Sequence, residues 1–333
     1  MMKKIAIVEA GIVALLLPLI SAGAAGRTAL KAGTWEIGNS SFRASQVKAG
    51  KMTPARLWCN SAEAVSAAIL DSACDIIGVQ ALCDSISGRV QGAASLLDIL
   101  NRERREFEWL VLSNTNPNFP LDGPVSNGTA VIWKASRFEL KDYGINWLSG
   151  LYDKPGREKS LIYGSGYAAV VWVRLFDREA GREVVFASAN VNGPTQYDKG
   201  QKVIYHEINV ANCRNLVTMM KNEIVPAGTA SVITLNARNS VNHEGYRELN
   251  SSVWFDVFDR LKEEGSLSDD DLKLPDTLNS PDESRIEGGR PDHILVDGFN
   301  IVSYKVLRRK YPCADGTMHY PSLHFPLVAD LTY

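Results

Sequence analysis

The chain has 333 residues, of which 45% are hydrophobic and 22% are charged. This composition is typical of a soluble globular protein and excludes a fibrous or wholly disordered chain. The formal net charge is −2, so no basic surplus favours nucleic acid as a partner, although net charge does not describe how charge is distributed over a surface.

The first residues have the pattern of an export signal. A basic start is followed by an apolar run at 10–20, which is too short to span a bilayer, and by small residues at 22–24. We therefore expect residues 1–24 to be a signal peptide and residues 25–333 to be one secreted or periplasmic domain without a membrane span. The alternative is a retained amino-terminal anchor, because Glu9 lies at the edge of the apolar run.

Strands are predicted where β-branched or aromatic runs are bounded by turn residues, and helices where apolar residues recur at helical spacing. Asn60 and Glu63 form a capping arrangement before the first predicted helix, and 263–289, rich in Asp, Ser, Pro and Gly, is predicted to be a surface loop. In chain order, the predicted strands are 33–38, 75–80, 109–113, 128–134, 138–147, 167–176, 184–190, 231–236, 292–296, 300–307 and 325–331, and the predicted helices are 64–70, 93–104 and 201–220.

The connections between these elements restrict the fold class. The turn at 177–182 joins two long strands directly, as an antiparallel pair requires, so a purely parallel doubly wound sheet is excluded. We predict an α/β (α+β) fold, a four-layer sandwich in which two mixed, mostly antiparallel sheets pack face to face with helices outside.

Five cysteines are present, and an exported protein can pair them, although an odd number leaves at least one thiol unpaired. Cys74 is separated from Cys83 by an extended run and from Cys59 by a predicted helix, distances too long for a bridge. The one disulfide candidate is Cys59 with Cys83, and free buried thiols are the alternative. No pair has the short spacing of a zinc knuckle.

Several segments carry a family resemblance in their order and spacing. Residues 75–80 (Asp-Ile-Ile-Gly-Val-Gln) are followed by a hairpin from 127–134 (Asn-Gly-Thr-Ala-Val-Ile-Trp-Lys), then by Trp-Leu-Ser at 147–149, by Asp-His-Ile-Leu-Val at 292–296 and by Pro-Ser-Leu-His-Phe-Pro at 321–326. From about Thr34 onward, this pattern resembles the endonuclease/exonuclease/phosphatase superfamily. The resemblance implies the same four-layer sandwich and a metal-dependent hydrolysis of phosphoesters.

Such hydrolysis needs a divalent cation held by carboxylates, a base that activates water, and donors for the developing oxyanion. Three positions at which the family has carboxylates carry none here. The Glu that follows Leu-Gln falls on Ala81, the Asp of a Gly-Asp-x-Asn turn falls on Asn236, and the Asp of the closing Ser-Asp-His motif falls on Leu323. The resemblance therefore implies weak or no magnesium binding.

Other positions are retained or exchanged. His324 and Asp292 match the family's base and its orienting carboxylate, although a buried His bonded to an Asp is also a common structural contact. A first-strand Asn becomes Glu36, and the Asn of the Gly-Asp-x-Asn turn becomes Arg238. We expect Arg238 to stand where the cation stood and to pair with Glu36; the alternative is two unrelated solvated side chains.

Two functions follow from this pattern. The first is a catalytically impaired protein that binds a phosphate-containing or carbohydrate ligand, or a protein partner, without a cofactor. The second is an active Mg²⁺-dependent phosphodiesterase or phosphatase with relocated metal ligands. The binding residues of the first are Glu36, Asn190, Asn192, Asn236 and Arg238, and the metal ligands of the second are drawn from Glu36, Asp84, Asp198 and Asp292.

The four other histidines have no spacing that suggests a metal site, so surface or loop positions are expected for them: His206, His243, His293 and His319.

Overall fold

A computed structural model gives the fold. It describes residues 28–38, 48–50, 61–82, 95–112, 128–148, 168–191, 202–237, 244–250, 253–279, 283–284, 286–287, 289–313 and 316–333. The expected signal peptide lies outside these residues, so its removal stays a prediction. Within the described part of the chain, no helix is both long enough and apolar enough to cross a membrane.

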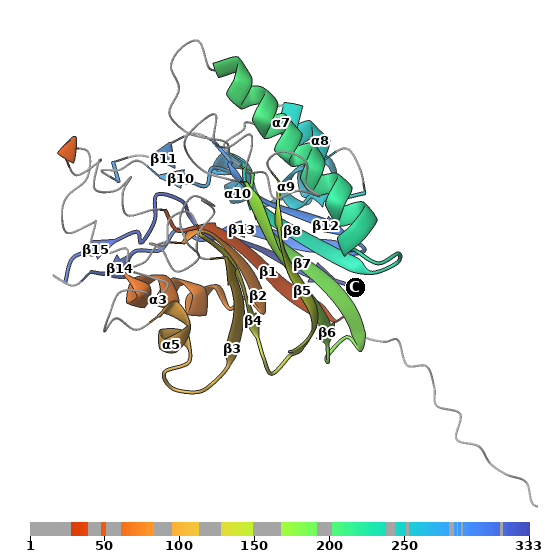
Figure 1. Ribbon diagram of the computed structural model, residues 1–333. Coiled ribbons are helices and arrows are strands. Elements are labelled where there is room, and N and C mark those ends of the chain that lie inside the picture. The colour runs from red at the N-terminus through yellow and green to blue at the C-terminus, as the bar shows by residue number, and fades with distance from the viewer. Residues whose placement is uncertain are drawn as a thin grey trace, which may run out of the picture.

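Two six-stranded sheets form the centre of the molecule (Figure 1). The first sheet has the order β13-β16-β1-β2-β4-β3, and the second has the order β5-β6-β7-β8-β12-β9. Both are mixed, because β1 pairs with β2 and β7 with β8 in parallel, whereas the other pairs are antiparallel. In the first sheet the bounds are β1 Ala29–Glu36, β2 Ile76–Leu82, β3 Phe107–Leu112, β4 Gly128–Lys134, β13 Asn300–Val306 and β16 Leu327–Thr332; in the second they are β5 Phe138–Trp147, β6 Ala169–Asp177, β7 Arg182–Asn190, β8 Ala230–Asn236, β9 Phe255–Asp256 and β12 Asp292–Asp297.

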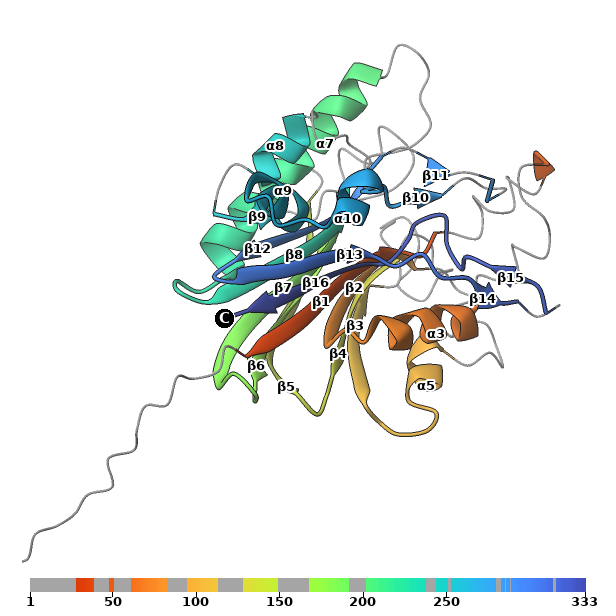
Figure 2. The same ribbon diagram turned by 180° about the vertical axis from the view of Figure 1, so that it is seen from behind.

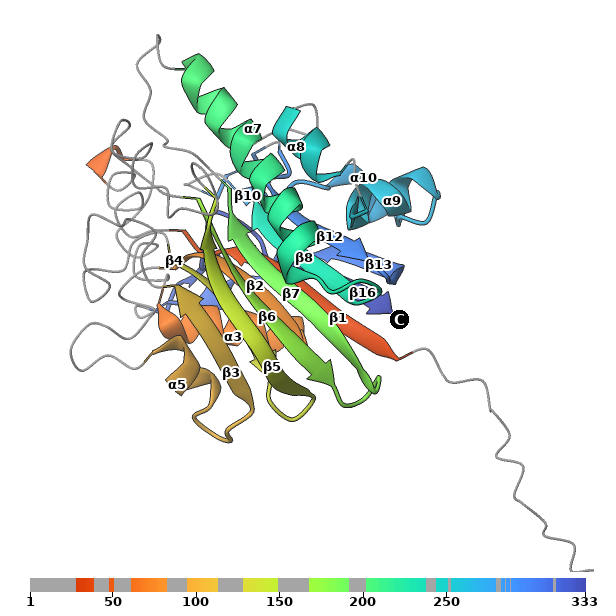
Figure 3. The ribbon, with the colours of Figure 1, turned by 45° about the vertical axis from the view of Figure 1, so that its right-hand side comes forward.

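Helices cover the outer faces of both sheets (Figures 2 and 3). Helices α3 (Ala62–Ser72) and α5 (Leu96–Leu100) pack against the first sheet. Helix α7 (Lys202–Met219), which continues as the π-helix η1 (Met220–Ile224), covers the second sheet together with α8 (Glu244–Leu249). The predicted four-layer sandwich is therefore confirmed.

Alternate side chains of strand β6 pack into two different cores. Val171 and Val173 belong to the apolar core between the two sheets, whereas Val170 belongs to the core beneath α7. Successive side chains of a strand point to opposite faces, so a strand buried on both faces needs apolar residues at nearly every position. Helix α9 (Val257–Glu263) contributes Phe258 to the central core, where its ring contacts Tyr304 of β13.

Most predicted strands are present. β4 and β5 have the predicted bounds, and β6 and β7 form the predicted antiparallel hairpin, with Asp177 opposite Arg182. One cap was assigned wrongly: Ser61, not Asn60, caps α3, because its side chain accepts a hydrogen bond from the amide of Ala64.

The prediction of a surface loop at 263–289 was also wrong. The segment contains α10 (Asp269–Lys273), β10 (Leu278–Asn279) and β11 (Ile286–Glu287), and Thr277 within it is fully buried. Its burial depends on distant partners, because the backbone around β10 bonds to residues 323–325. Two more short strands, β14 (Tyr311–Pro312) and β15 (Met318–His319), were not predicted.

The cysteines differ in state. Cys74 and Cys213 are buried free thiols, and burial raises the pKa of each to about 12. Cys313 is disulfide-bonded, which was not predicted. The predicted partners Cys59 and Cys83 lie outside the described residues.

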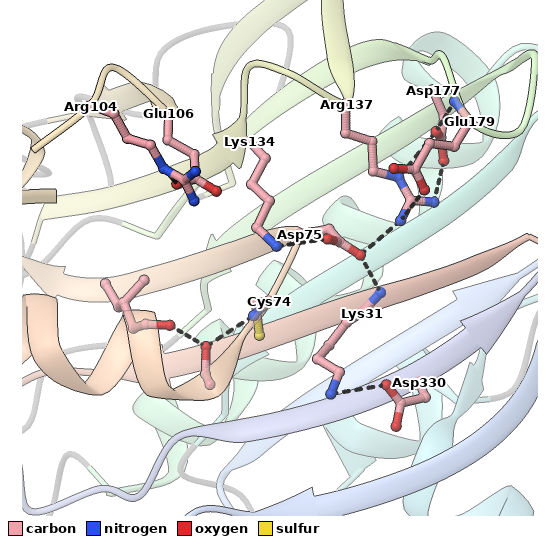
Figure 4. Close-up of polar contacts among 12 residues, drawn as sticks. Lys31, Cys74, Asp75, Arg104, Glu106, Lys134, Arg137, Asp177, Glu179 and Asp330 are labelled. Atoms are coloured by element: carbon pink, nitrogen blue, oxygen red, sulfur yellow. Dashed lines mark hydrogen bonds and ion pairs between the residues drawn. The ribbon is translucent and has the colours of Figure 1, made fainter. Parts of the chain in front are cut away.

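A polar cluster joins the two sheets at the end of the strands away from His324 (Figure 4). Arg137, in the turn between β4 and β5, donates two hydrogen bonds to Asp177 of β6, at 3.1 and 2.7 Å, and one to Asp75 ahead of β2, at 2.8 Å. Tyr333 donates to Asp177, and Lys134 to Asp75. We call these five residues the Arg137 clamp.

Candidate functional site

Polar side chains gather where neighbouring strands of both sheets end. Glu36 of β1 lies opposite Gln80 of β2 in the first sheet, and Asn236 of β8 lies between Asn190 of β7 and Asp292 of β12 in the second. Opposite residues of paired strands project from the same face, so each sheet presents one polar row at this end. Three of the predicted binding and catalytic residues are thus neighbours in the second row: Asn236 lies opposite Asn190 on one side and opposite Asp292 on the other.

Asp292 and His324 form the centre of the site. Asp292 is fully buried, and its Oδ2 lies 2.8 Å from Nδ1 of His324. Asn236 donates to Oδ1 of the carboxylate at 3.1 Å, and Thr277 donates to Oδ2 at 2.5 Å. The carboxylate thus fixes the imidazole orientation, as the predicted pair requires.

Hydrogen bonds hold the His324 segment against two strands, β10 and β1. His324 forms an isolated antiparallel bridge with Leu278 of β10, and its carbonyl accepts a hydrogen bond from the indole of Trp35 at 2.9 Å. Ser322 accepts from the amide of His324 at 3.1 Å and donates to the carbonyl of Glu36 at 2.7 Å. These bonds place the imidazole beside the end of β1.

Glu36 is the carboxylate on the other side of His324. Its Oε1 lies 3.7 Å from Nε2 of His324, and its side chain is 13% exposed. This distance is that of an ion contact and is too long for a hydrogen bond. The imidazole therefore has a carboxylate near each ring nitrogen.

A buried hydrogen-bond network next to the site joins the two sheets. The Gln80 amide accepts from Thr34 at 3.2 Å and donates to Ser188 of β7 at 2.9 Å, and Ser188 lies 3.0 Å from Thr129 of β4. These side chains are almost inaccessible to water, so they join the two sheets at a fixed spacing. At Gly78 the sheets are so close that a Cβ would meet the Thr234 hydroxyl at 1.9 Å.

Comparison with known proteins identifies the architecture. No protein-family model matches the chain, and no curated protein matches it. A crystal structure of an endonuclease/exonuclease/phosphatase family protein from Bacteroides thetaiotaomicron superposes with a TM-score of 0.67 at 16% identity, covering 92% of this chain and 95% of that chain. The chain has the endonuclease/exonuclease/phosphatase fold.

Two further structures with the endonuclease/exonuclease/phosphatase fold are similar to the chain. A mannosyl-6-phosphatase from Bacteroides thetaiotaomicron has a TM-score of 0.67 at 16% identity, covering 91% of this chain and 100% of that chain. The human Nocturnin catalytic domain with bound sulfate has a TM-score of 0.58 at 16% identity, covering 92% of this chain and 97% of that chain. Identities this low show a common fold, and the chemistry has to be argued from the site.

The described residues do not fit the divalent cation that the family resemblance implies. Ala81, at the predicted position of a carboxylate ligand, is a buried residue with φ 56° at a register shift of β2, and its methyl offers no ligand atom. The Asn236 amide donates to Asp292, and both Asp292 oxygens already accept hydrogen bonds. Glu36 remains, and among the described residues no three His, Cys, Asp or Glu side chains come together as metal ligands do.

Some predicted site residues cannot be placed. Asn192, Arg238, Asp84 and Asp198 lie outside the described residues, so the Glu36–Arg238 pair and the relocated ligands stay predictions.

Thr277 was not predicted as a site residue, because it lies in the predicted loop and no local pattern marks it. The prediction of a surface or loop position for His293 was wrong: this residue is fully buried on β12, with Nδ1 2.8 Å from Asp256 Oδ2. Arg290 donates to the same carboxylate at 2.5 Å and to Asp259 at 2.7 Å. A buried ionic cluster of Asp256, Arg290 and His293 thus includes residues on both sides of Asp292 in the chain.

Proposed function

We propose that the protein is a catalytically impaired representative of the endonuclease/exonuclease/phosphatase fold that binds a phosphate-containing or carbohydrate ligand, or a protein partner, without hydrolysing it. One observation carries this proposal. His324 and Asp292 form a hydrogen-bonded pair at 2.8 Å, but Ala81 and Asn236 stand at positions where the family resemblance implies carboxylate ligands.

The size of the rate acceleration that a general base supplies favours this conclusion. A positioned general base contributes about 10²–10⁴-fold to a rate, whereas enzymes accelerate their reactions by roughly 10⁶-fold or more. His324 with Asp292 does not supply the remainder, because charge stabilisation of the phosphoryl oxygens is the larger contribution in such reactions.

Hydrolysis assays test the proposal. We expect p-nitrophenyl phosphate and bis-p-nitrophenyl phosphate to show no chelator-sensitive turnover with Mg²⁺, Mn²⁺ or Ca²⁺. The triple variant Ala81→Glu, Asn236→Asp and Leu323→Asp restores carboxylates and should bind Mg²⁺ more tightly by calorimetry.

Chelator-sensitive turnover by the unmodified protein, lost in His324→Ala, would instead establish the active hydrolase with relocated ligands. Circular dichroism of each variant controls for folding.

A further inference from the structure

The Glu36 carboxylate has unused hydrogen-bonding capacity. Its side chain is 13% exposed, and its Oε1 lies 3.7 Å from His324 Nε2. Among the described residues, no side chain or backbone amide donates a hydrogen bond to either of its carboxylate oxygens. A carboxylate so far removed from water ordinarily accepts several hydrogen bonds, so Glu36 can accept further hydrogen bonds from a ligand beyond what the described residues donate.

Asp292 does not share this capacity. Its Oδ1 accepts from Asn236, and its Oδ2 accepts from Thr277 beside the His324 ring. Asp292 is also fully buried, whereas Glu36 ends a strand in the row that faces His324. Of these two carboxylates, Glu36 is therefore the one that can accept hydrogen bonds from a ligand.

The charge of Glu36 selects against an anion at this place. A phosphate group close to His324 Nε2 would lie within a few ångströms of the carboxylate, and like charges repel strongly in a site partly removed from water. A hydroxyl group at the same place donates to the carboxylate in a charge-assisted hydrogen bond. Asn190, which ends β7 and is partly exposed, carries an uncharged carboxamide, a group whose chemistry suits a hydroxyl better than a charge would.

We propose that this site takes a carbohydrate through its hydroxyl groups, with Glu36 as the acceptor, and that Glu36 discriminates against a phosphate at this position. The inference rests on the proposed binding function and narrows its ligand class.

Calorimetric titration of the whole protein tests the inference, with mannose, glucose, galactose and N-acetylglucosamine compared with their 6-phosphates and with inorganic phosphate. We expect at least one neutral sugar to bind tenfold or more tightly than its 6-phosphate. Glu36→Gln keeps the shape of the side chain and removes its charge. It should weaken binding of the neutral sugar about tenfold and reduce the preference for the sugar over its 6-phosphate to less than threefold. Glu108→Gln, an exposed change on β3, should leave both affinities unchanged.

Several outcomes would overturn the inference: no binding of any neutral sugar, a 6-phosphate that binds more tightly than its sugar, or an unchanged preference in Glu36→Gln. Equal losses of sugar affinity in Glu36→Gln and Arg238→Gln, with no further loss in the double variant, would show that Glu36 acts through an ion pair with Arg238. That result would overturn the inference too. A sugar phosphate bound tightly but not hydrolysed would leave the proposed function standing, whereas chelator-sensitive turnover would refute the proposed function itself.

Discussion

Asp292 shows that the pair it forms with His324 has a structural role. A buried carboxylate is costly unless hydrogen bonds satisfy it, and here Asn236 and Thr277 donate to its two oxygens. Each donor comes from a different part of the chain, β8 and the segment before β10. The pair therefore contributes to packing between distant segments as well as to any ligand site, in agreement with the structural alternative for His324.

Thr277→Val tests this role at one side chain. The substitution keeps the shape but removes the donor to buried Asp292, so it should lower the free energy of unfolding by about 1–3 kcal/mol in urea titrations. Thr332→Val is the matched control, because the Thr332 hydroxyl is buried without a hydrogen-bond partner and its removal should be neutral or stabilising. Similar losses in both variants would contradict the assignment.

At the level of elements, the start of α9 is fixed by charge as well as by capping. Asp256 accepts from the amides of Phe258 and Asp259 and also contacts Arg290 and His293. Burial alone would raise the pKa of Asp256, but the charge of Arg290 and the hydrogen bond with His293 outweigh it and bring the pKa well below its ordinary value. The helix is thereby joined to β12 next to the site.

The depressed pKa of Asp256 predicts a pH dependence. The folded protein holds the carboxylate ionised more strongly than the unfolded chain does, so this stability is complete above about pH 4 and is lost as the pH falls through the folded value. Asp256→Asn keeps a good cap but removes the charge, and should cost about 3–5 kcal/mol at pH 7. Urea unfolding at pH 7, 5 and 3 should show the gap between the two proteins shrinking at pH 3; a constant gap would contradict the prediction.

The elements also show what sequence can predict. β4 and β5 were predicted with their bounds because a short turn separates two long runs of strand-forming residues. β10 and β11 have two residues each, and their hydrogen bonds reach residues 323–325, so no local pattern identifies them. In the site, motif order placed Asp292 beside His324, but the burial of Thr277 and His293 depends on long-range packing that a motif does not contain.

For the whole molecule, the Arg137 clamp is the counterpart of the site at the opposite end of the sandwich. Asp75 belongs to the first sheet and Asp177 to the second, and one guanidinium binds both (Figure 4). Asp177 is fully buried, and it accepts hydrogen bonds from Arg137, from the Tyr333 hydroxyl and from the amides of Glu179 and Ala180. The clamp therefore fixes the separation of the sheets where the Gln80 network does not reach.

Arg137→Met should lower the free energy of unfolding by about 3–5 kcal/mol, because it leaves Asp177 buried without its cation. Arg104→Met is the matched control: Arg104 pairs with Glu106 but its side chain is 79% exposed, so the change should stay within about 0.5 kcal/mol. Guanidinium titrations of both variants measure the difference. A loss below about 1 kcal/mol in Arg137→Met would show that the clamp contributes little.

The position of β16 has a consequence for how the molecule is made. β16 lies between β13 and β1, so Ala29 pairs with Thr332 across nearly the whole sequence. Closing so long a loop is entropically expensive, and contacts between distant residues slow folding. During synthesis, β1 leaves the ribosome long before β16 exists, and one edge of it stays open until β16 has been made. The first sheet is therefore completed only after β16 has left the ribosome, and the same late step brings His324 to its carboxylates.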